Sequence, residues 1–399
     1  MQVTRLAEAV DRWLPVVVFA ALPTLGLLAG PAYSSLIIGL TVVTLLRGMA
    51  AGRGLPPIDD TLAALAGAFL ALCWASAAWS IVPATSLRTA MAETAILVAM
   101  LLACAKRRDP EEFADAVFPV LMGACVVGTT IACLDMALGD RLQALVSGKP
   151  GLESATKYNR GLDYLALIAW PTLGYAWWRR QWLAFVVVIG AVAIALAMGL
   201  SLAGRVAFAA GFVVLVLAGA APRLVAAGLA LCTGAFVITL PLALRLLAAR
   251  RVALMPYVKS SGIQRLQIWD YMTARVLERP LQGWGLLSAK SVPIRPDELA
   301  SYVGFSGNGV YPHNQWLQLW VELGALGAAA GLAFAWLVLA RIRRLPAVLQ
   351  PFACAAFTSA MAVAGVNYEI TTDSWWAALA ATAMLFMILA RQMSQESGA

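Results

Sequence analysis

The 399-residue sequence has little charge, because only 13% of its residues are Asp, Glu, Lys or Arg, whereas 61% are hydrophobic. No soluble globular domain of this size has such a balance. Charged residues are absent from most of a dozen apolar stretches. Each stretch has roughly 17 to 25 residues, enough for a helix to span a hydrocarbon core about 30 Å thick. The chain is therefore predicted to be an all-α, polytopic membrane protein.

Twelve membrane spans are expected within a single integral membrane domain that covers residues 1–399. The first two are joined only by Gly30 and Pro31, and the sixth contains Asp163 and Pro171, so ten or eleven full crossings remain an alternative. The spans lie near residues 14–29, 31–46, 60–79, 87–105, 113–136, 161–177, 181–199, 206–221, 224–246, 313–340, 347–367 and 374–390.

The Lys and Arg residues near the span ends indicate the orientation in the membrane, because short cytoplasmic loops are enriched in them. With the N-terminus inside, fourteen basic residues fall on the cytoplasmic side and six on the outer side. Both termini are therefore expected in the cytoplasm. The six outer residues are Arg88, Arg141, Lys149, Lys157, Arg160 and Arg205.

Other features are missing, and each absence excludes or weakens a class of function. The basic residues form no run, so nucleic acid is excluded as a partner. No D-x-D motif occurs, and Asp297-Glu298 is the one adjacent acidic pair in the polar segment 247–312, so metal chemistry has little support. No cysteine occurs in that segment. The six cysteines of the chain fall inside apolar spans and are interpreted as small buried hydrophobic residues, not as disulfide partners or metal ligands: Cys73, Cys104, Cys125, Cys133, Cys232 and Cys354.

Segment 247–312 is the only long interruption of the hydrophobic pattern and is expected to form a large outer loop between the ninth and tenth spans. Within it, Ser261 and Gln264 fit an S-x-x-Q capping box at a helix start. Apolar residues then recur at helical spacing until Arg279 and Pro280: Ile263, Leu266, Trp269, Met272 and Val276. An amphipathic helix that lies over the membrane face is predicted.

Arg265 falls in the first turns of this predicted helix. Unpaired N–H groups and the helix dipole favour an anion there, and a guanidinium adds a bidentate donor for phosphate. A diphosphate is therefore one candidate ligand. The alternative is an arginine at a lipid headgroup or paired with an acid such as Asp270.

His313 is the only histidine, and Pro312 beside it suits the first turn of a helix. His313 is thus expected at the outer mouth of the tenth span. A helix N-terminus disfavours the imidazolium, so the ring would stay neutral and could act as a general base. The alternative is a structural histidine that anchors the interface next to Tyr311 and Trp316.

Further cations are expected on the same side of the membrane. Arg205 lies in a short outer turn between two apolar spans. A charge there is costly unless it faces a wet cavity or an anion. Lys157 and Arg160 precede the sixth span, and Arg88 lies at the outer end of the fourth. The alternative for each is that its side chain reaches lipid headgroups.

Two acids within the spans are interpreted as structural. Glu322 follows His313 by nine residues, which is about 900° around a helix and hence the opposite face. Glu322 is therefore expected to tie neighbouring spans together, and Glu93 in the fourth span is expected to do the same.

A further set of residues in the polar segment and the tenth span forms a pattern of its own: Arg265, Trp269, the run Arg279-Pro280-Leu281-Gln282-Gly283-Trp284-Gly285, the run His313-Asn314-Gln315-Trp316-Leu317, then Glu322-Leu323-Gly324 and Gly327. This pattern resembles the signature of the O-antigen ligase and polymerase superfamily. The resemblance covers about 65 residues directly, and the twelve-span layout extends it to the whole chain. It implies a GT-C-like glycosyltransferase.

For an O-antigen ligase, the resemblance implies transfer of polysaccharide from undecaprenyl diphosphate to the lipid A-core at the periplasmic face of the bacterial inner membrane. No metal or other cofactor is expected, and the partners are the donor, the acceptor and membrane lipids. His313 would be the catalytic base and Arg265 a ligand of the donor diphosphate. Arg205 would be a second cationic contact, with Arg160, Lys157 and Arg88 as further candidates.

Two other functions compete with this expectation. An O-antigen polymerase or a protein O-oligosaccharyltransferase shares the motif, although polymerases tend to have two large outer loops and protein-targeting members a longer C-terminal portion. A transporter of polyprenyl-linked lipid belongs to a different class. It would need polar sites at the midplane and commonly internal repeats, and no obvious repeat is present.

Overall fold

The computed structural model describes residues 2–52, 54–105, 113–148, 152–254, 256, 260–296, 298 and 310–398. Within these ranges the secondary structure consists of helices and their connections, without strands. This confirms the predicted all-α class. In lipid, backbone N–H and C=O groups have no water to bind, and a helix satisfies them within one segment.

Each of the twelve predicted stretches falls within a helix or includes most of one. The helices are α1 (Gln2–Leu28), α2 (Ala32–Ala50), α3 (Asp60–Ala75), η1 (Ser76–Ala78), α4 (Pro83–Ala103), α5 (Phe113–Ala137), α6 (Arg141–Ser147), α7 (Leu152–Trp178), α8 (Trp182–Met198), α9 (Leu202–Ala220), α10 (Pro222–Ala249), α11 (Arg251–Leu254), α12 (Ser260–Glu278), η2 (Ala289–Ser291), α14 (Gln315–Ile342), α15 (Gln350–Ala364) and α16 (Asp373–Gly398).

In the described part of the chain, eight helices are long and apolar enough to cross a membrane: α2, α3 with η1, α4, α5, α9, α10, α14 and α16. Three shorter apolar helical segments accompany them, namely Trp13–Leu28 of α1, α8 and α15. The helices therefore confirm a polytopic membrane protein. The count of twelve crossings stays a prediction.

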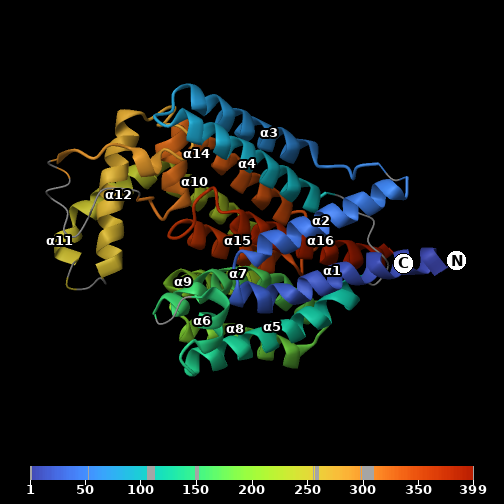
Figure 1. Cartoon of the computed structure of the whole chain (residues 1–399). Helices are drawn as coiled ribbons and strands as arrows, with labels where there is room; N and C mark the ends of the chain where they lie inside the picture. Colours follow the sequence, from blue (N-terminus) through green and yellow to red (C-terminus); the bar gives the residue numbers. More distant parts are fainter. Residues whose placement is uncertain are drawn as a thin grey trace.

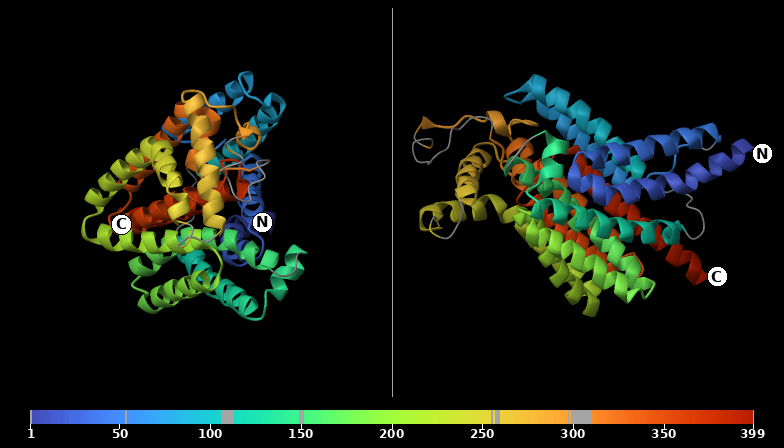
Figure 2. Two further views of the ribbon diagram at one scale, coloured as in Figure 1. Left: turned by 90° about the vertical axis from the view of Figure 1, so that its left-hand side faces the viewer. Right: turned by 60° about the horizontal axis from the view of Figure 1, so that its bottom comes forward.

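The long helices run side by side as one bundle, and α12 lies crosswise over one end of it (Figure 1). Both termini lie at the opposite end (Figure 1). In the view onto the α12 end, α12 stands in front of the bundle (Figure 2, left). Most of the polar segment between α10 and α14 is thus gathered at the end of the bundle that is far from the termini.

The apolar face of α12 is buried, as its spacing predicted. Ile263, Leu266, Met272 and Val276 are each less than 9% exposed. This face packs against α10 and α14, so it covers other helices rather than lipid. The helix already begins at Ser260, so Ser261 lies inside it and does not have the predicted N-cap position.

Two helices begin earlier in the sequence than predicted, and this changes where three cationic residues lie. Ser201 caps α9, because its Oγ accepts a hydrogen bond from the Gly204 N–H at 3.0 Å. Arg205 therefore lies in the first turns of α9 and not in a turn between spans. Helix α7 begins at Leu152, so Lys157 and Arg160 lie on the helix itself rather than before it.

The start of α14 also differs from the prediction. Asn314 is the N-cap, and its side chain accepts a hydrogen bond from the Leu317 N–H at 2.9 Å. Pro312 and His313 precede this cap, so the prediction that Pro312 occupies the first helical turn was wrong. His313 has a left-handed backbone, with φ at +49°.

The six cysteines, all within the described residues, form no disulfide, and the prediction of buried side chains holds for only three of them. Cys73, Cys125 and Cys354 are buried, and Cys104 and Cys133 are half-buried. Cys232 on α10 is exposed, which contradicts the prediction for that residue.

Candidate functional site

Two of the motifs noted in the sequence bind each other. Helix α14 is interrupted at Gly324, where φ is +64° and ψ is −155°. The interruption leaves the carbonyl groups of the preceding turn available. Val321 O accepts a hydrogen bond from Trp284 N at 2.9 Å, and Glu322 O accepts one from Gly285 N at 2.8 Å. The loop after α12 is thus joined to the middle of α14 by backbone bonds.

Glycine is required on both sides of this junction. A Cβ at Gly283 would lie 2.5 Å from the backbone carbonyl atoms of Glu322, and φ at Gly283 is +69°. A Cβ at Gly324 would lie 2.3 Å from the carbonyl oxygen of Leu281. Since L side chains rarely adopt such backbone angles, these motif glycines have a structural role.

The Glu322 carboxylate holds the same loop from inside the protein. The residue is 0% exposed, and its carboxylate oxygens accept hydrogen bonds from Leu287 N at 2.7 Å, Ala289 N at 3.4 Å and Gln318 Nε2 at 3.0 Å. The prediction that Glu322 ties neighbouring spans was wrong, because it ties α14 to the loop that contains η2. Its hydrogen bonds go to groups other than His313. The opposite-face prediction does not apply, because His313 precedes the N-cap of α14 and does not lie on the same helix as Glu322.

His313 lies in a short segment between α12 and α14. Its ring centroid is 4.0 Å from that of Tyr311, at an interplanar angle of 38°. The segment is fastened to α12, because Trp269 Nε1 donates a hydrogen bond to Pro312 O at 2.8 Å. The His313 Nδ1 is buried and has no hydrogen-bond partner among the described residues, so one ring nitrogen is uncommitted.

The electrostatic surroundings keep the His313 ring neutral. Burial first, and then the charges of Arg265 and Lys290, together lower the pKa of His313 to about 4. A neutral imidazole was predicted, but from a different cause. His313 precedes the N-cap of α14. Its pKa is lowered by burial and by two neighbouring cations, and not by a helix N-terminus as predicted.

Arg265 is half-buried on α12 and forms no hydrogen bond or ion pair with the described residues. No pairing with Asp270 is therefore seen. Its charge acts on both His313 and Tyr311. The structure thus places Arg265 beside His313, with a guanidinium that is available to an external anion.

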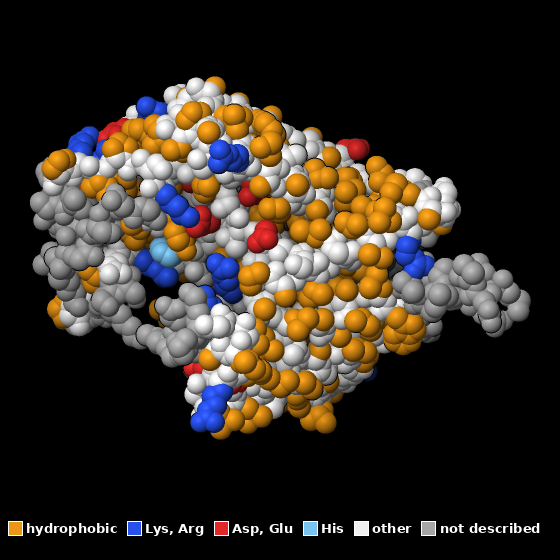
Figure 3. Space-filling view, in the orientation of Figure 1, with side chains coloured by type: hydrophobic (Ala, Val, Ile, Leu, Met, Phe, Trp, Pro, Cys, Tyr) orange, Lys and Arg blue, Asp and Glu red, His pale blue; other side chains and the backbone are white. Residues whose placement is uncertain are grey.

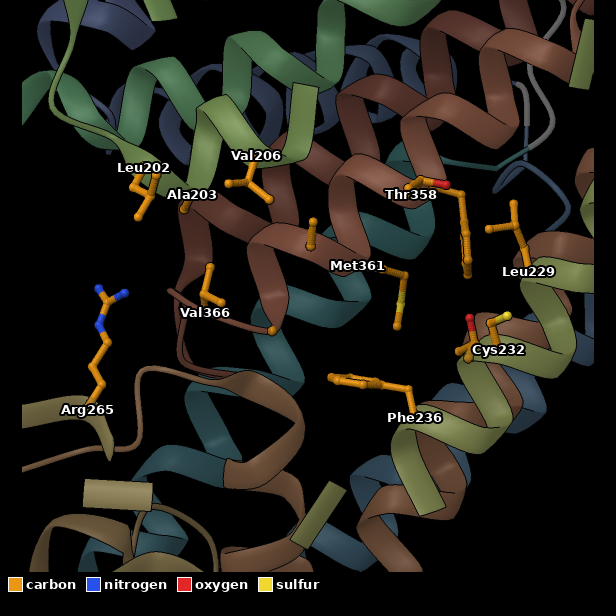
Figure 4. A pocket seen from close by; sticks show the side chains of 14 residues that line it. Leu202, Ala203, Val206, Leu229, Cys232, Phe236, Arg265, Thr358, Met361 and Val366 are labelled. Carbon is orange, nitrogen blue, oxygen red and sulfur yellow. The ribbon is translucent and has the colours of Figure 1, made fainter. Parts of the chain in front are cut away.

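Arg265 also forms the polar end of an apolar groove of about 490 Å³ (Figure 4). The walls come from α9, α10 and the end of α15. In the close-up the Arg265 side chain extends in the direction of Leu202 and Ala203 (Figure 4). The apolar lining includes Leu202, Ala203, Val206, Leu229, Cys232, Phe236, Phe357, Met361 and Val366.

Tyr311 connects the site to two further charges. Burial raises the pKa of Tyr311, the charge of Glu369 adds to this, and Arg160 and Arg265 oppose it. Arg160 from α7 therefore lies close enough to act on the same ring as Arg265. The single histidine is visible on the surface with Lys or Arg side chains beside it, while the flank of the bundle is largely hydrophobic (Figure 3).

The other three predicted cations are less closely connected to His313. Arg205 is exposed on α9, between the groove residues Ala203 and Val206 in sequence, and its Nε donates to Ser201 O at 3.4 Å. Lys157 and Arg88 are exposed on α7 and α4. Among the described residues, no contact brings Lys157 or Arg88 to the imidazole.

Lys290 is a member of this site that the sequence did not single out. Its Nζ lies 5.1 Å from the Tyr311 ring centroid and 3.1 Å from Glu369 Oε1. Lys290 and Glu369 are 79 positions apart in the sequence, and no local pattern links them. Only the fold could reveal this contact.

The acidic pair of the loop is partly engaged elsewhere. Glu298 forms an ion pair with Arg275 and accepts a hydrogen bond from Arg295 N at 3.0 Å. Asp297 lies outside the described residues. The part of the chain that the structure describes contains no group of three His, Cys, Asp or Glu residues suited to a metal ion.

Comparison with known proteins matches residues 185–332 to the O-antigen ligase family. This segment contains Arg205, Arg265, His313 and both glycine motifs. The matching relatives include proteins of Rickettsia conorii and Rickettsia typhi that are provisionally named polysaccharide ligases. They are 29% identical over 119 residues and 28% identical over 123 residues.

These alignments cover 29% and 30% of this chain and the same shares of the two relatives. The chain thus matches about three tenths of the length of each curated relative. Together, the matches confirm the resemblance to the O-antigen ligase family that the motifs indicated.

Proposed function

With residues 185–332 taken as an O-antigen ligase domain, we propose that this protein transfers O-antigen polysaccharide from undecaprenyl diphosphate to the lipid A-core oligosaccharide. The reaction occurs at the periplasmic face of the bacterial inner membrane, without a metal, and both termini are cytoplasmic. One observation carries the proposal: Arg265, an uncommitted cation at the polar end of an apolar groove, lies close enough to the neutral imidazole of His313 to lower its pKa.

The groove suits a donor that is apolar along most of its length and anionic at one end. A polyprenyl chain lies against the side chains of α9, α10 and α15, while its diphosphate binds the Arg265 guanidinium. The volume of about 490 Å³ accepts the part of the chain nearest the diphosphate. Arg160 and Arg205 are further contacts for the diphosphate, and Lys157 and Arg88 are more peripheral ones.

The chemistry is a displacement at the anomeric carbon of the donor sugar. His313 accepts the proton of the acceptor hydroxyl as the oxygen forms its bond to that carbon, and the bond from carbon to the diphosphate oxygen breaks. The diphosphate leaves with the electron pair, and Arg265 stabilises the negative charge that develops on it. Attack from the face opposite the leaving group inverts the anomeric centre.

The acceptor is tested by reconstitution. The purified full-length protein is incubated in proteoliposomes with undecaprenyl-diphosphate glycan and one of three acceptors: rough lipopolysaccharide, O-antigen subunits on undecaprenyl diphosphate, or a pilin-like protein. A higher-mass product with rough lipopolysaccharide alone is expected. A product with only the O-antigen subunits would identify a polymerase, and a product with only the pilin-like protein would identify a protein glycosyltransferase; either result would contradict the ligase. No product with any acceptor would contradict a transferase.

Variants of the two central residues test the assigned roles. His313→Ala is expected to reduce turnover about 10²- to 10⁴-fold, the usual contribution of a general base, while donor binding is retained. Arg265→Gln is expected to reduce kcat/KM for the donor about 10- to 150-fold, because a hydrogen bond to a charged group contributes about 1.5–3 kcal/mol. Arg295→Gln, which removes an exposed charge from the same loop, is the matched control and keeps both values.

A further inference from the structure

Lys290 is connected to His313 through one intervening ring. Its Nζ is 5.1 Å from the centroid of the Tyr311 ring, and that centroid is 4.0 Å from the centroid of the imidazole. The Nζ also forms an ion pair with Glu369 at 3.1 Å, and the Glu369 side chain is only 16% exposed. The ammonium is therefore held between a largely buried carboxylate and the ring that packs on His313.

The backbone that carries Lys290 is fixed from two sides. On one side, the buried Glu322 carboxylate of α14 accepts the hydrogen bond from Ala289 N. On the other side, the Tyr271 hydroxyl of α12 donates to Val292 O. Helix η2 is thus bound to both helices that flank the His313 segment.

Glu369 is also well anchored, in the connection between α15 and α16. Asn367 Nδ2 donates to the buried Asp163 carboxylate at 2.7 Å, and Tyr368 Oη donates to it at 3.1 Å. On the other side of Glu369, Ile370 N donates to Gln318 Oε1 at 2.9 Å. A carboxylate between such fixed neighbours gives Lys290 a defined position.

We propose that Lys290 is a positioning residue for the transfer reaction: anchored by Glu369, its ammonium holds Tyr311 against the imidazole and so fixes the orientation of His313. This inference rests on the proposed function of His313 as the base. No hydrogen bond from the described part of the chain orients the His313 Nδ1, so we assign that orientation to ring packing. A cation over an aromatic ring contributes an attraction of its own to the arrangement.

Electrostatics supports the same assignment. Arg265 from α12 and Lys290 from η2 both lower the pKa of His313, after the larger effect of burial. Glu369 and Arg160 act on Tyr311, which contacts the imidazole. Removal of the Lys290 charge therefore raises the pKa of His313 from about 4 in the direction of its ordinary value of 6.5.

The single histidine makes this shift directly measurable. The full-length protein is labelled with [¹³Cε1]histidine, purified through a histidine-free tag, and titrated by NMR in detergent. Lys290→Met is expected to move the midpoint of the one resonance to higher pH. Lys290→Arg keeps the charge and is expected to restore the wild-type midpoint, and Arg295→Gln, an exposed charge of the same loop, is expected to leave it unchanged. The same midpoint in Lys290→Met and wild type would overturn the inference.

The transfer assay supplies the second readout. Lys290→Met is expected to lose turnover more steeply at low pH than wild type does, because a protonated imidazole cannot accept a proton. If the pKa of His313 returned fully to 6.5, turnover at pH 5.5 would be about tenfold lower than at pH 8. Glu369→Gln keeps the Lys290 ammonium but removes the ion pair that holds it in position. Turnover of this variant is therefore expected to fall about equally at every pH. A Lys290→Met loss that does not depend on pH would reduce Lys290 to a structural role and overturn the inference.

Failure of the inference and failure of the proposed function give different results. If His313→Ala transfers normally, the base assignment fails whatever the NMR titration gives. If His313→Ala is inactive while Lys290→Met keeps the wild-type titration midpoint and pH profile, the positioning role alone is wrong.

Discussion

Substitution of Gly324 by alanine tests whether the glycine motifs build the site. A Cβ at this position would lie 2.3 Å from Leu281 O and 2.4 Å from Leu281 C, both backbone atoms. The backbone angles there are ones that an L residue adopts at a cost of about 1–3 kcal/mol. Relief of the clash requires the loop to withdraw from α14.

Withdrawal of the loop would break hydrogen bonds such as those from Trp284 N to Val321 O and from Ala325 N to Pro280 O. At about 0.5–1.5 kcal/mol for each bond, two lost bonds add about 1–3 kcal/mol. Gly324→Ala is therefore expected to lower the free energy of unfolding by about 2–6 kcal/mol, counting the backbone strain.

The assay is thermal unfolding of the purified protein in detergent, combined with the transfer reaction. Gly228→Ala on α10 is the matched control, because a Cβ there meets no atom within 4 Å and alanine favours a helix by up to about 1 kcal/mol. Gly324→Ala is expected to unfold at a lower temperature than Gly228→Ala and to lose turnover even below that temperature. Equal unfolding temperatures and normal transfer would refute the structural role of the glycine.

Three further predictions concern the donor and the base. Because burial and two cations hold the pKa of His313 at about 4, wild-type turnover should be flat between about pH 6 and pH 8 and fall only as the pH drops towards 4; an acid limb centred at 6.5 would contradict this. Val206→Trp, which fills the groove, should raise KM for undecaprenyl donors more than for donors with a short prenyl chain, and an equal effect on both would argue against the groove. Arg88→Gln should reduce kcat/KM for the donor less than Arg265→Gln does, and a larger effect of Arg88→Gln would indicate that the diphosphate binds elsewhere.

Helix positions could largely be predicted from the sequence, because an apolar stretch of sufficient length in lipid has few alternatives to a helix. The buried face of α12 also followed from the helical spacing of Ile263, Leu266, Met272 and Val276. Helix starts were less predictable, since a local cap decided them, as Asn314 does for α14.

The site could be predicted only as far as single residues reveal their chemistry. His313 stands out as the single histidine and Arg265 as an arginine near a predicted helix start. Each also had a structural interpretation, and only the motif resemblance favoured the functional one. Lys290 has no such mark, because its role depends on a contact with Glu369 that only the packed helices create. The groove likewise arises where α9, α10 and α15 meet, and no segment alone contains it.

The central claim is that Arg265 and His313 meet around the diphosphate of a lipid-linked donor. It is tested most directly by an experimental structure of the full-length protein with undecaprenyl diphosphate bound. We expect the diphosphate within hydrogen-bonding distance of the Arg265 guanidinium, beside His313, with the prenyl chain along the groove between α9, α10 and α15. A diphosphate bound at the end of the bundle that carries the termini, or away from Arg265, would contradict the claim.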